Sequence, residues 1–74
     1  MAVPNISARK AIKTFKKFGF KKNRQTGSHV ILKKPNHTYA LSVPDHGAKP
    51  LKKGTLRSLI SDAGLTVKEF TDKM

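Results

Sequence analysis

Apolar residues recur along the first part of the chain with the period of an α-helix. Between residues 7 and 18 they stand three or four positions apart, at Ala8, Ala11, Ile12, Phe15 and Phe18. This spacing places them on one helical face, so a helix is expected over residues 7–18. Ser7 is expected to cap its first turn, and Gly19 to end it.

The middle of the chain has the alternating pattern of β-strands. Residues 20–24 predict a short, highly charged strand that ends in QTGS, a glycine-containing loop of hairpin length. HVILKK predicts the next strand, with Val30 and Leu32 on one face. KPNH is expected to form a type I turn before a third strand, TYALSV. The residues of this third strand that should face inward are Tyr39, Leu41 and Val43.

Two more helical patterns follow the loop PDHGAKP. Residues 52–63 carry an apolar stripe at helical spacing, and Gly64 is expected to end this helix. The stripe consists of Leu56, Leu59, Ile60 and Ala63. Thr66 and Glu69 then stand at capping-box spacing, which predicts a further short helix at the C-terminus.

This order of elements predicts one α+β domain over residues 1–74. Three consecutive strands with short turns form an antiparallel sheet. Two amphipathic helices then cover one face of the sheet and leave the other open. Double-stranded-RNA-binding domains have the same α-β-β-β-α order, which by itself does not separate a binding protein from an enzyme.

The charge of the chain narrows the classes of partner. Sixteen Lys and Arg stand against four Asp and Glu, a formal net charge of +12, and residues 1–44 contain no acid. Such a chain is attracted to polyanions, and nucleic acid is the leading class. No apolar run approaches the roughly 20 residues that span a bilayer. There is no cysteine for disulfides or thiolate metal sites; a cytoplasmic location is expected.

The stretch KPLKKGTLR at residues 49–57 gathers cations around the start of the second long helix. These cations are Lys49, Lys52, Lys53 and Arg57. Free backbone N–H groups and the positive end of the helix dipole favour an anion there. Gly54 lets a phosphate approach closely, and Thr55 adds a hydroxyl. We therefore prefer a phosphate contact to the alternative, a solvated lysine-rich helix start.

The stretch RQTGSHV contains the main candidate for chemistry, His29. It begins a predicted strand with the parity opposite to the inward residues, which points it at the open face. Histidine exchanges protons near neutral pH. On spacing alone an ordinary surface histidine remains the commoner alternative. Gly27 closes the hairpin and is a candidate for close backbone approach, while Ser28 is either a phosphate contact or a turn residue.

The other two histidines, His37 and His46, lie in predicted turns. Their spacing, without cysteine, gives only a weak metal signal, so no metal site is assigned. No serine triad, phosphate-binding loop or dinucleotide fingerprint is present. The aromatic residues occupy expected core positions, so no exposed stacking platform is predicted. Recognition would then rest mainly on backbone charge and shape.

Several short motifs together resemble the HicA toxins of type II toxin–antitoxin modules. They are FGF at 18–20, TGSHV at 26–30, VPDHG at 43–47 and LKKGTLRSLISDAGL at 51–65. The resemblance runs from about Ile6 to Leu65. It implies a double-stranded-RNA-binding-like fold and an mRNA interferase that inhibits translation. It also implies a HicB antitoxin that covers the active face. The catalytic histidine of the family corresponds to His29, and its V-P-x-H histidine to His46, which we give an auxiliary role.

The resulting hypothesis is a metal-independent endoribonuclease without cofactors. His29 would act as general base or acid while a 2′-OH attacks the adjacent phosphodiester, and nearby cations would stabilise the developing charge. The expected RNA contacts are Gly27, Ser28, Lys33, Lys49, Lys52, Lys53, Gly54, Thr55 and Arg57. One alternative is a non-catalytic double-stranded-RNA-binding protein. Another is a DNA- or membrane-surface accessory protein, for which the basic helix would be the contact.

Overall fold

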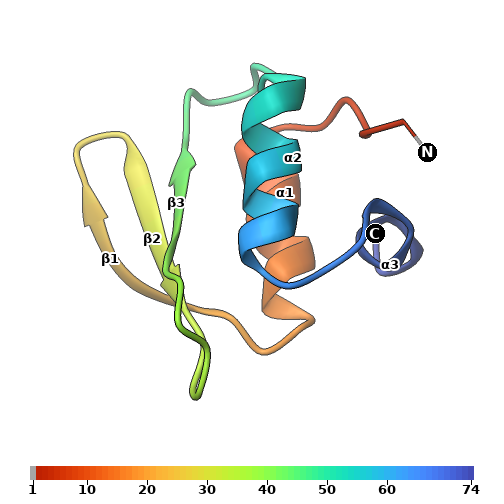
Figure 1. Ribbon diagram of the computed structural model, residues 1–74. Coiled ribbons are helices and arrows are strands. Elements are labelled where there is room, and N and C mark those ends of the chain that lie inside the picture. The colour runs from red at the N-terminus through yellow and green to blue at the C-terminus, as the bar shows by residue number, and fades with distance from the viewer. Residues whose placement is uncertain (1) are drawn as a thin grey trace.

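A helix, three strands and two further helices follow one another in the computed structural model, which describes residues 2–74 (Figure 1). The elements are α1 (Ala8–Lys16), β1 (Lys21–Thr26), β2 (His29–Lys33), β3 (Leu41–Pro44), α2 (Lys53–Asp62) and α3 (Val67–Asp72). The predicted α+β order and the additional C-terminal helix are confirmed.

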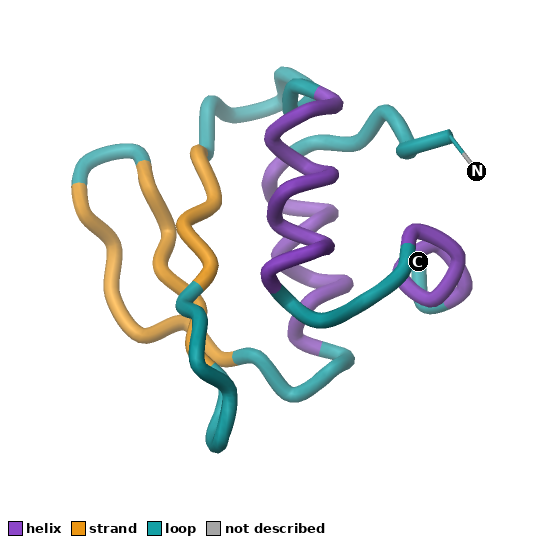
Figure 2. The backbone as a smooth tube through the Cα atoms, viewed as in Figure 1, coloured by secondary structure: helices purple, strands orange, loops and turns teal. Residues whose placement is uncertain are grey.

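The three strands form an antiparallel sheet in the order β1-β2-β3. Val30 pairs with Val43 and Leu32 with Leu41, and all four side chains are buried. The helices α1 and α2 lie together on this side of the sheet, and the opposite face is open (Figure 2). Strand β1 is exposed along its whole length, so the sheet is covered mainly over β2 and β3.

Helix α1 is shorter than its apolar pattern suggested. Ser7 accepts a hydrogen bond from the Lys10 backbone N–H, as expected of an N-cap, but the helix ends at Lys16 and a turn leads to Gly19, whose φ is 99°. Thr14 is buried on the inner face and its hydroxyl donates to the Lys10 carbonyl at 2.9 Å. This bond explains how a hydroxyl is accommodated in the core.

Helices α1 and α2 begin at the same end of the molecule and run in the same direction (Figure 1). Ser7 forms an isolated β-bridge with Pro50, and the Leu51 N–H donates to the Ile6 carbonyl at 2.8 Å. These contacts fix the segment before α1 against the segment before α2. As a result, the N-termini of both helices lie close to the end of β3.

Helix α3 is attached to the core by one aromatic side chain. Phe70 is fully buried and its ring centroid lies 4.9 Å from that of Phe15 in α1. The predicted capping box is present, because Thr66 accepts from the Glu69 N–H and the Glu69 carboxylate accepts from the Thr66 N–H. Within residues 2–74 there is no helix with the length and apolar character that crossing a membrane requires.

Two predictions for the segment between β2 and β3 are wrong. Tyr39 does not face inward; it is 61% exposed, because β3 starts only at Leu41. The turn at KPNH is not type I, since Asn36 has a φ of 62°, which a type II turn requires at that position. His37 holds this loop against the rest of the fold, because its Nε2 lies 2.6 Å from the Asp62 carbonyl oxygen and its ring packs edge-on against Phe20.

Candidate functional site

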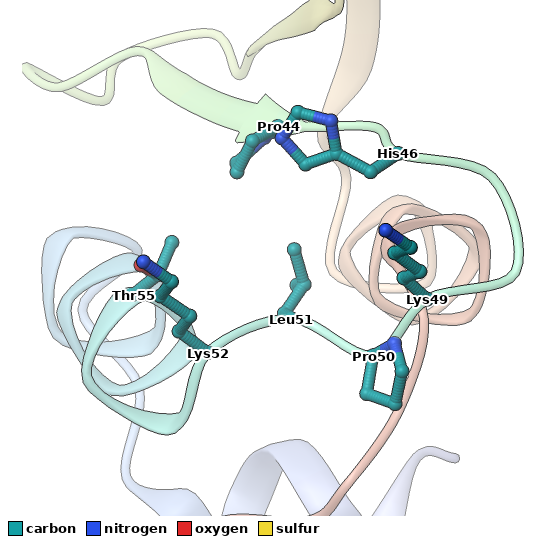
Figure 3. Close-up of a pocket in the computed structure, with 7 residues that line it drawn as sticks. All are labelled: Pro44, His46, Lys49, Pro50, Leu51, Lys52 and Thr55. Atoms are coloured by element: carbon teal, nitrogen blue, oxygen red, sulfur yellow. The ribbon is translucent and has the colours of Figure 1, made fainter.

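A cavity of about 320 Å³ lies between the end of β3 and the start of α2 (Figure 3). Its wall residues come from three neighbouring segments: the strand end, the connecting loop and the first turn of α2. They are Pro44, His46, Lys49, Pro50, Leu51, Lys52 and Thr55. Leu51 is only 6% exposed, so its side chain closes the cavity toward the core. The cavity lies at the end of the molecule where α1 and α2 both begin.

The candidate catalytic residue, His29, stands one strand away from this cavity. It pairs with Pro44 in the register of β2 and β3, and the Asp45 N–H donates to the Ser28 carbonyl at 2.6 Å. Directly paired residues project from the same face of a sheet, so the side chains of His29 and Pro44 share the open face. His29 is exposed, and within residues 2–74 no hydrogen-bond partner contacts its imidazole.

The turn before His29 requires its glycine. Thr26 pairs with His29, so Gly27 and Ser28 form a two-residue hairpin loop. Gly27 has a φ of 58° at the first central position, a conformation that favours glycine. Beyond its two chain neighbours, no atom lies within 4 Å of where its Cβ would be, so the space beside it is also open. Both roles considered for Gly27, hairpin closure and clearance, are therefore compatible with its geometry.

The N-terminus of α2 has free backbone donors. Its N-cap, Lys52, makes no side-chain capping bond, and the first turn contains no acid. The first helical bond runs from the Leu56 N–H to the Lys52 carbonyl, which leaves the N–H groups of residues 53–55 without helical acceptors. By contrast, the other two helices in residues 2–74 have side-chain caps, Ser7 and Thr66. An anion can take the place of the missing cap.

The cations around α2 are exposed and have no acidic partners among residues 2–74. Across residues 2–74 the single salt bridge joins Lys68 and Asp72 on α3, away from the cavity. The nearby Asp45 is engaged within its own loop, where it accepts from the Gly47 N–H at 3.1 Å. Apart from its chain neighbours and the backbone of its own helix, no atom lies within 4 Å of the place that a Cβ on Gly54 would occupy, so a phosphate can approach the backbone there.

The predicted RNA contacts fall into two groups. The structure brings Lys49, Lys52 and Thr55 together as cavity walls, and residues 53–54 and Arg57 lie on the same two turns of α2. Gly27, Ser28 and His29 adjoin them through the pairing of β2 and β3. Lys33 is separate, because it stands at the other end of β2, about 13 Å from His29 at roughly 3.3 Å per residue.

The apolar walls of the cavity, Pro44, Pro50 and Leu51, were not predicted as site residues. The one sequence feature that could have pointed to these walls is that the two prolines stand at the ends of the loop PDHGAKP. Of the two turn histidines, His46 lines the cavity, whereas His37 is bonded at the far end of α2. In the described part of the chain no three side chains of His, Asp or Glu gather as metal ligands.

Comparison with known proteins identifies the family of the chain. The family described as HicA toxin of bacterial toxin–antitoxin systems matches residues 8–65. No curated protein matches the chain. The matched residues run from the first residue of α1 past the end of α2 and include the cavity and His29. The chain therefore belongs to the HicA toxin family, whose membership implies a HicB-type antitoxin as its partner in the module.

Proposed function

We propose that this toxin is an endoribonuclease, an mRNA interferase that inhibits translation in the cytoplasm, and that residues 1–74 act as one HicA-like domain. One observation carries the proposal: an exposed histidine is paired across the sheet with the wall of a cationic cavity at an uncapped helix N-terminus. A proton-transfer group and a phosphate-binding group are thereby joined through His29 and Pro44.

The RNA backbone would bind at the start of α2. The free N–H groups of residues 53–55 donate to phosphate oxygens, and the absence of a side chain at Gly54 allows this approach. Lys52, the N-cap, and Lys53, the first residue of the helix, add positive charge at the same turn. From this position the backbone passes over Pro44 onto the open face, where His29 projects.

The chemistry is an attack of the ribose 2′-oxygen on the adjacent phosphorus. His29 removes the 2′-OH proton as the oxygen–phosphorus bond forms, and the bond from phosphorus to the 5′-oxygen breaks. Water supplies the proton to the departing 5′-oxygen. The products are a 2′,3′-cyclic phosphate and a 5′-hydroxyl end. The amides and lysines at α2 stabilise the negative charge on the phosphorane, so the step requires no metal ion.

The first test removes the imidazole. We expect His29→Ala to lose about 10²–10⁴-fold in the cleavage rate of an RNA oligonucleotide in the presence of chelator, with unchanged circular dichroism. Thr26→Ala is the matched control, because Thr26 pairs with His29 and its side chain projects from the same face of the hairpin. A folded His29→Ala protein that cleaves as fast as the wild type would refute the catalytic assignment.

The second test removes the attacking group from the substrate. An oligonucleotide with a single 2′-O-methyl at the cleaved position should bind as the parent does and resist cleavage there. Cleavage of this substrate would show that the 2′-oxygen is not the nucleophile. Wild-type protein that binds RNA and leaves it intact would instead favour the alternative of a non-catalytic double-stranded-RNA-binding protein.

A further inference from the structure

Part of the cavity is unsuited to phosphate. Pro44, Pro50 and Leu51 give it apolar walls, and the deeply placed Leu51 forms its base. A phosphate gains nothing from such contacts, because burial of a charged group next to apolar side chains costs free energy. At about 320 Å³ the cavity is at the lower end of the roughly 300–1,000 Å³ of small-molecule sites. Its size therefore fits one small ring system.

The arrangement of the walls favours a flat ligand. Figure 3 shows the rings of Pro44 and His46 on one side of the cavity and the Leu51 side chain facing them. Lys52 and Thr55 close one end, and Lys49 stands at the other. A ligand with apolar faces and polar edges fits such a slot. Nucleobases have this character, and bases splayed out of single-stranded RNA commonly stack on histidine.

We propose that this cavity is a nucleobase pocket, which takes the base of one splayed-out nucleotide beside the cleaved phosphodiester and stacks it on His46. The inference rests on the proposed function, since it takes RNA as the substrate. The pairing of His29 with Pro44 places the pocket wall next to the histidine that removes the 2′-OH proton. A base held in the pocket would fix the ribose and phosphate to which it is attached.

The polar walls also select among bases. The Lys49 and Lys52 side chains only donate hydrogen bonds, and the Thr55 hydroxyl can donate or accept. No carboxylate or amide side chain lines the cavity. On the edge that faces the major groove of a duplex, guanine presents only the acceptors O6 and N7 and uracil only O4, whereas adenine adds the N6 amino donor to its N7 and cytosine presents the N4 amino donor. A base that turns this edge toward Lys49 and Lys52 should therefore be guanine or uracil.

The direct test is a titration of the wild-type protein with mononucleotides, which contain no phosphodiester to cleave. Guanosine and uridine 5′-monophosphates should shift the Leu51 methyl signals in nuclear magnetic resonance spectra through the ring current of the bound base. Ribose 5-phosphate should shift the Gly54 amide signal alone. The proposal is overturned if ribose 5-phosphate moves the Leu51 methyls as far as the nucleotides do. It is also overturned if no nucleotide moves them while the Gly54 signal saturates.

Variants of the wall residues distinguish stacking of a base on His46 from attraction by the lysines. His46→Ala should weaken guanosine monophosphate binding about fivefold or more, while His46→Phe retains it, because a phenyl ring also stacks. Lys49→Met should remove the preference for guanine over adenine. The matched control is Lys53→Met. Lys53 lies outside the cavity wall, so this substitution should weaken the binding of nucleotides and of ribose 5-phosphate alike. Full guanosine monophosphate affinity in His46→Ala would exclude the stacking role.

An abasic substrate separates this inference from the proposed function. RNA with an abasic ribose at the position bound by the pocket keeps its 2′-OH and phosphates, and should be cleaved at least fivefold more slowly than intact RNA. Equal cleavage of both would refute the pocket and leave the endoribonuclease intact. Saturable nucleotide binding without any RNA cleavage would refute the endoribonuclease and leave the pocket.

Discussion

At the scale of single residues, the three histidines have distinct surroundings. His29 is exposed beside the hairpin, His46 lines the cavity, and His37 joins two elements of the fold. Turn and strand positions in the sequence did not distinguish the last two. The difference arises from the tertiary contacts of each ring, so substitutions at the three sites should affect different quantities.

His37→Ala should lower stability and leave the chemistry unchanged. The variant removes the contact of 2.6 Å between Nε2 and the Asp62 carbonyl and the edge-on packing against Phe20. We expect a loss of about 1–2 kcal/mol in the free energy of unfolding, measured by urea denaturation. RNA cleavage per folded molecule should equal that of the wild type. A folded His37→Ala protein without activity would contradict this assignment.

Gly54→Ala should separate stability from binding. Gly54 is in the first turn of α2 without a left-handed φ, and a Cβ there meets no atom within 4 Å beyond its chain neighbours and its own helix backbone. Alanine should therefore raise the free energy of unfolding by up to about 1 kcal/mol through its helix propensity. The same methyl group would obstruct a phosphate at the free N–H groups and weaken RNA binding.

Urea denaturation and an RNA-binding titration of Gly54→Ala measure these two effects. The matched control is Ser58→Ala, an exposed position on α2 outside the first turn, which should leave RNA binding unchanged. A Gly54→Ala protein that binds RNA as tightly as the wild type would show that no phosphate of the RNA binds at this turn.

At the scale of elements, the sequence predicted most of what local patterns can determine. The order of helices and strands, the parity of Val30 and Leu32 and the capping box of α3 all follow from spacing along the chain. The alternation failed at Tyr39, because it begins before Leu41, where the chain enters the sheet. The segment before β3 is instead held by the contact of His37 with Asp62, two residues that are distant in sequence and close in space.

The same distinction between local patterns and tertiary contacts applies to the candidate site. The cations and Gly54 at the start of α2 could be predicted, because a helix N-terminus is a local feature. The cavity could not, since spacing along residues 44–55 does not give the path of the loop between β3 and α2, which places Pro44 and His46 opposite Leu51. The position of His46 in the cavity wall, where we propose that a base stacks, likewise depends on the path of this loop, and no aromatic pattern in the sequence indicates it.

Helix α3 should be essential for stability although it lies outside the residues that match the family. Phe70→Ala would empty a fully buried position against Phe15 and should cost about 3–5 kcal/mol. Urea denaturation measures this loss. The matched control is Lys73→Ala on the exposed C-terminal turn, which should change stability by less than about 0.5 kcal/mol. A loss below about 1 kcal/mol at Phe70 would mean that α3 contributes little to the core.

At the scale of the whole molecule, the net charge of +12 opposes folding and would favour the proposed binding of RNA. Within residues 2–74 only one salt bridge offsets it. Added salt screens the repulsion between cations in the folded chain, and it also weakens the release of counterions that drives RNA binding. Added salt should therefore change the stability of the fold and the affinity for RNA in opposite directions, and this pair of changes identifies the effect of the net charge.

Raising sodium chloride should therefore increase the melting temperature of the free protein while it weakens RNA binding. Sulfate at equal ionic strength should stabilise more than chloride, because a divalent anion can bind the uncapped start of α2. The excess effect of sulfate should decrease in Lys52→Ala and stay the same in Lys68→Ala, whose lysine already pairs with Asp72. Thermal unfolding monitored by circular dichroism in both salts decides the matter. An equal response of the two variants would show that sulfate acts on the chain in general, and that the start of α2 has no special affinity for anions.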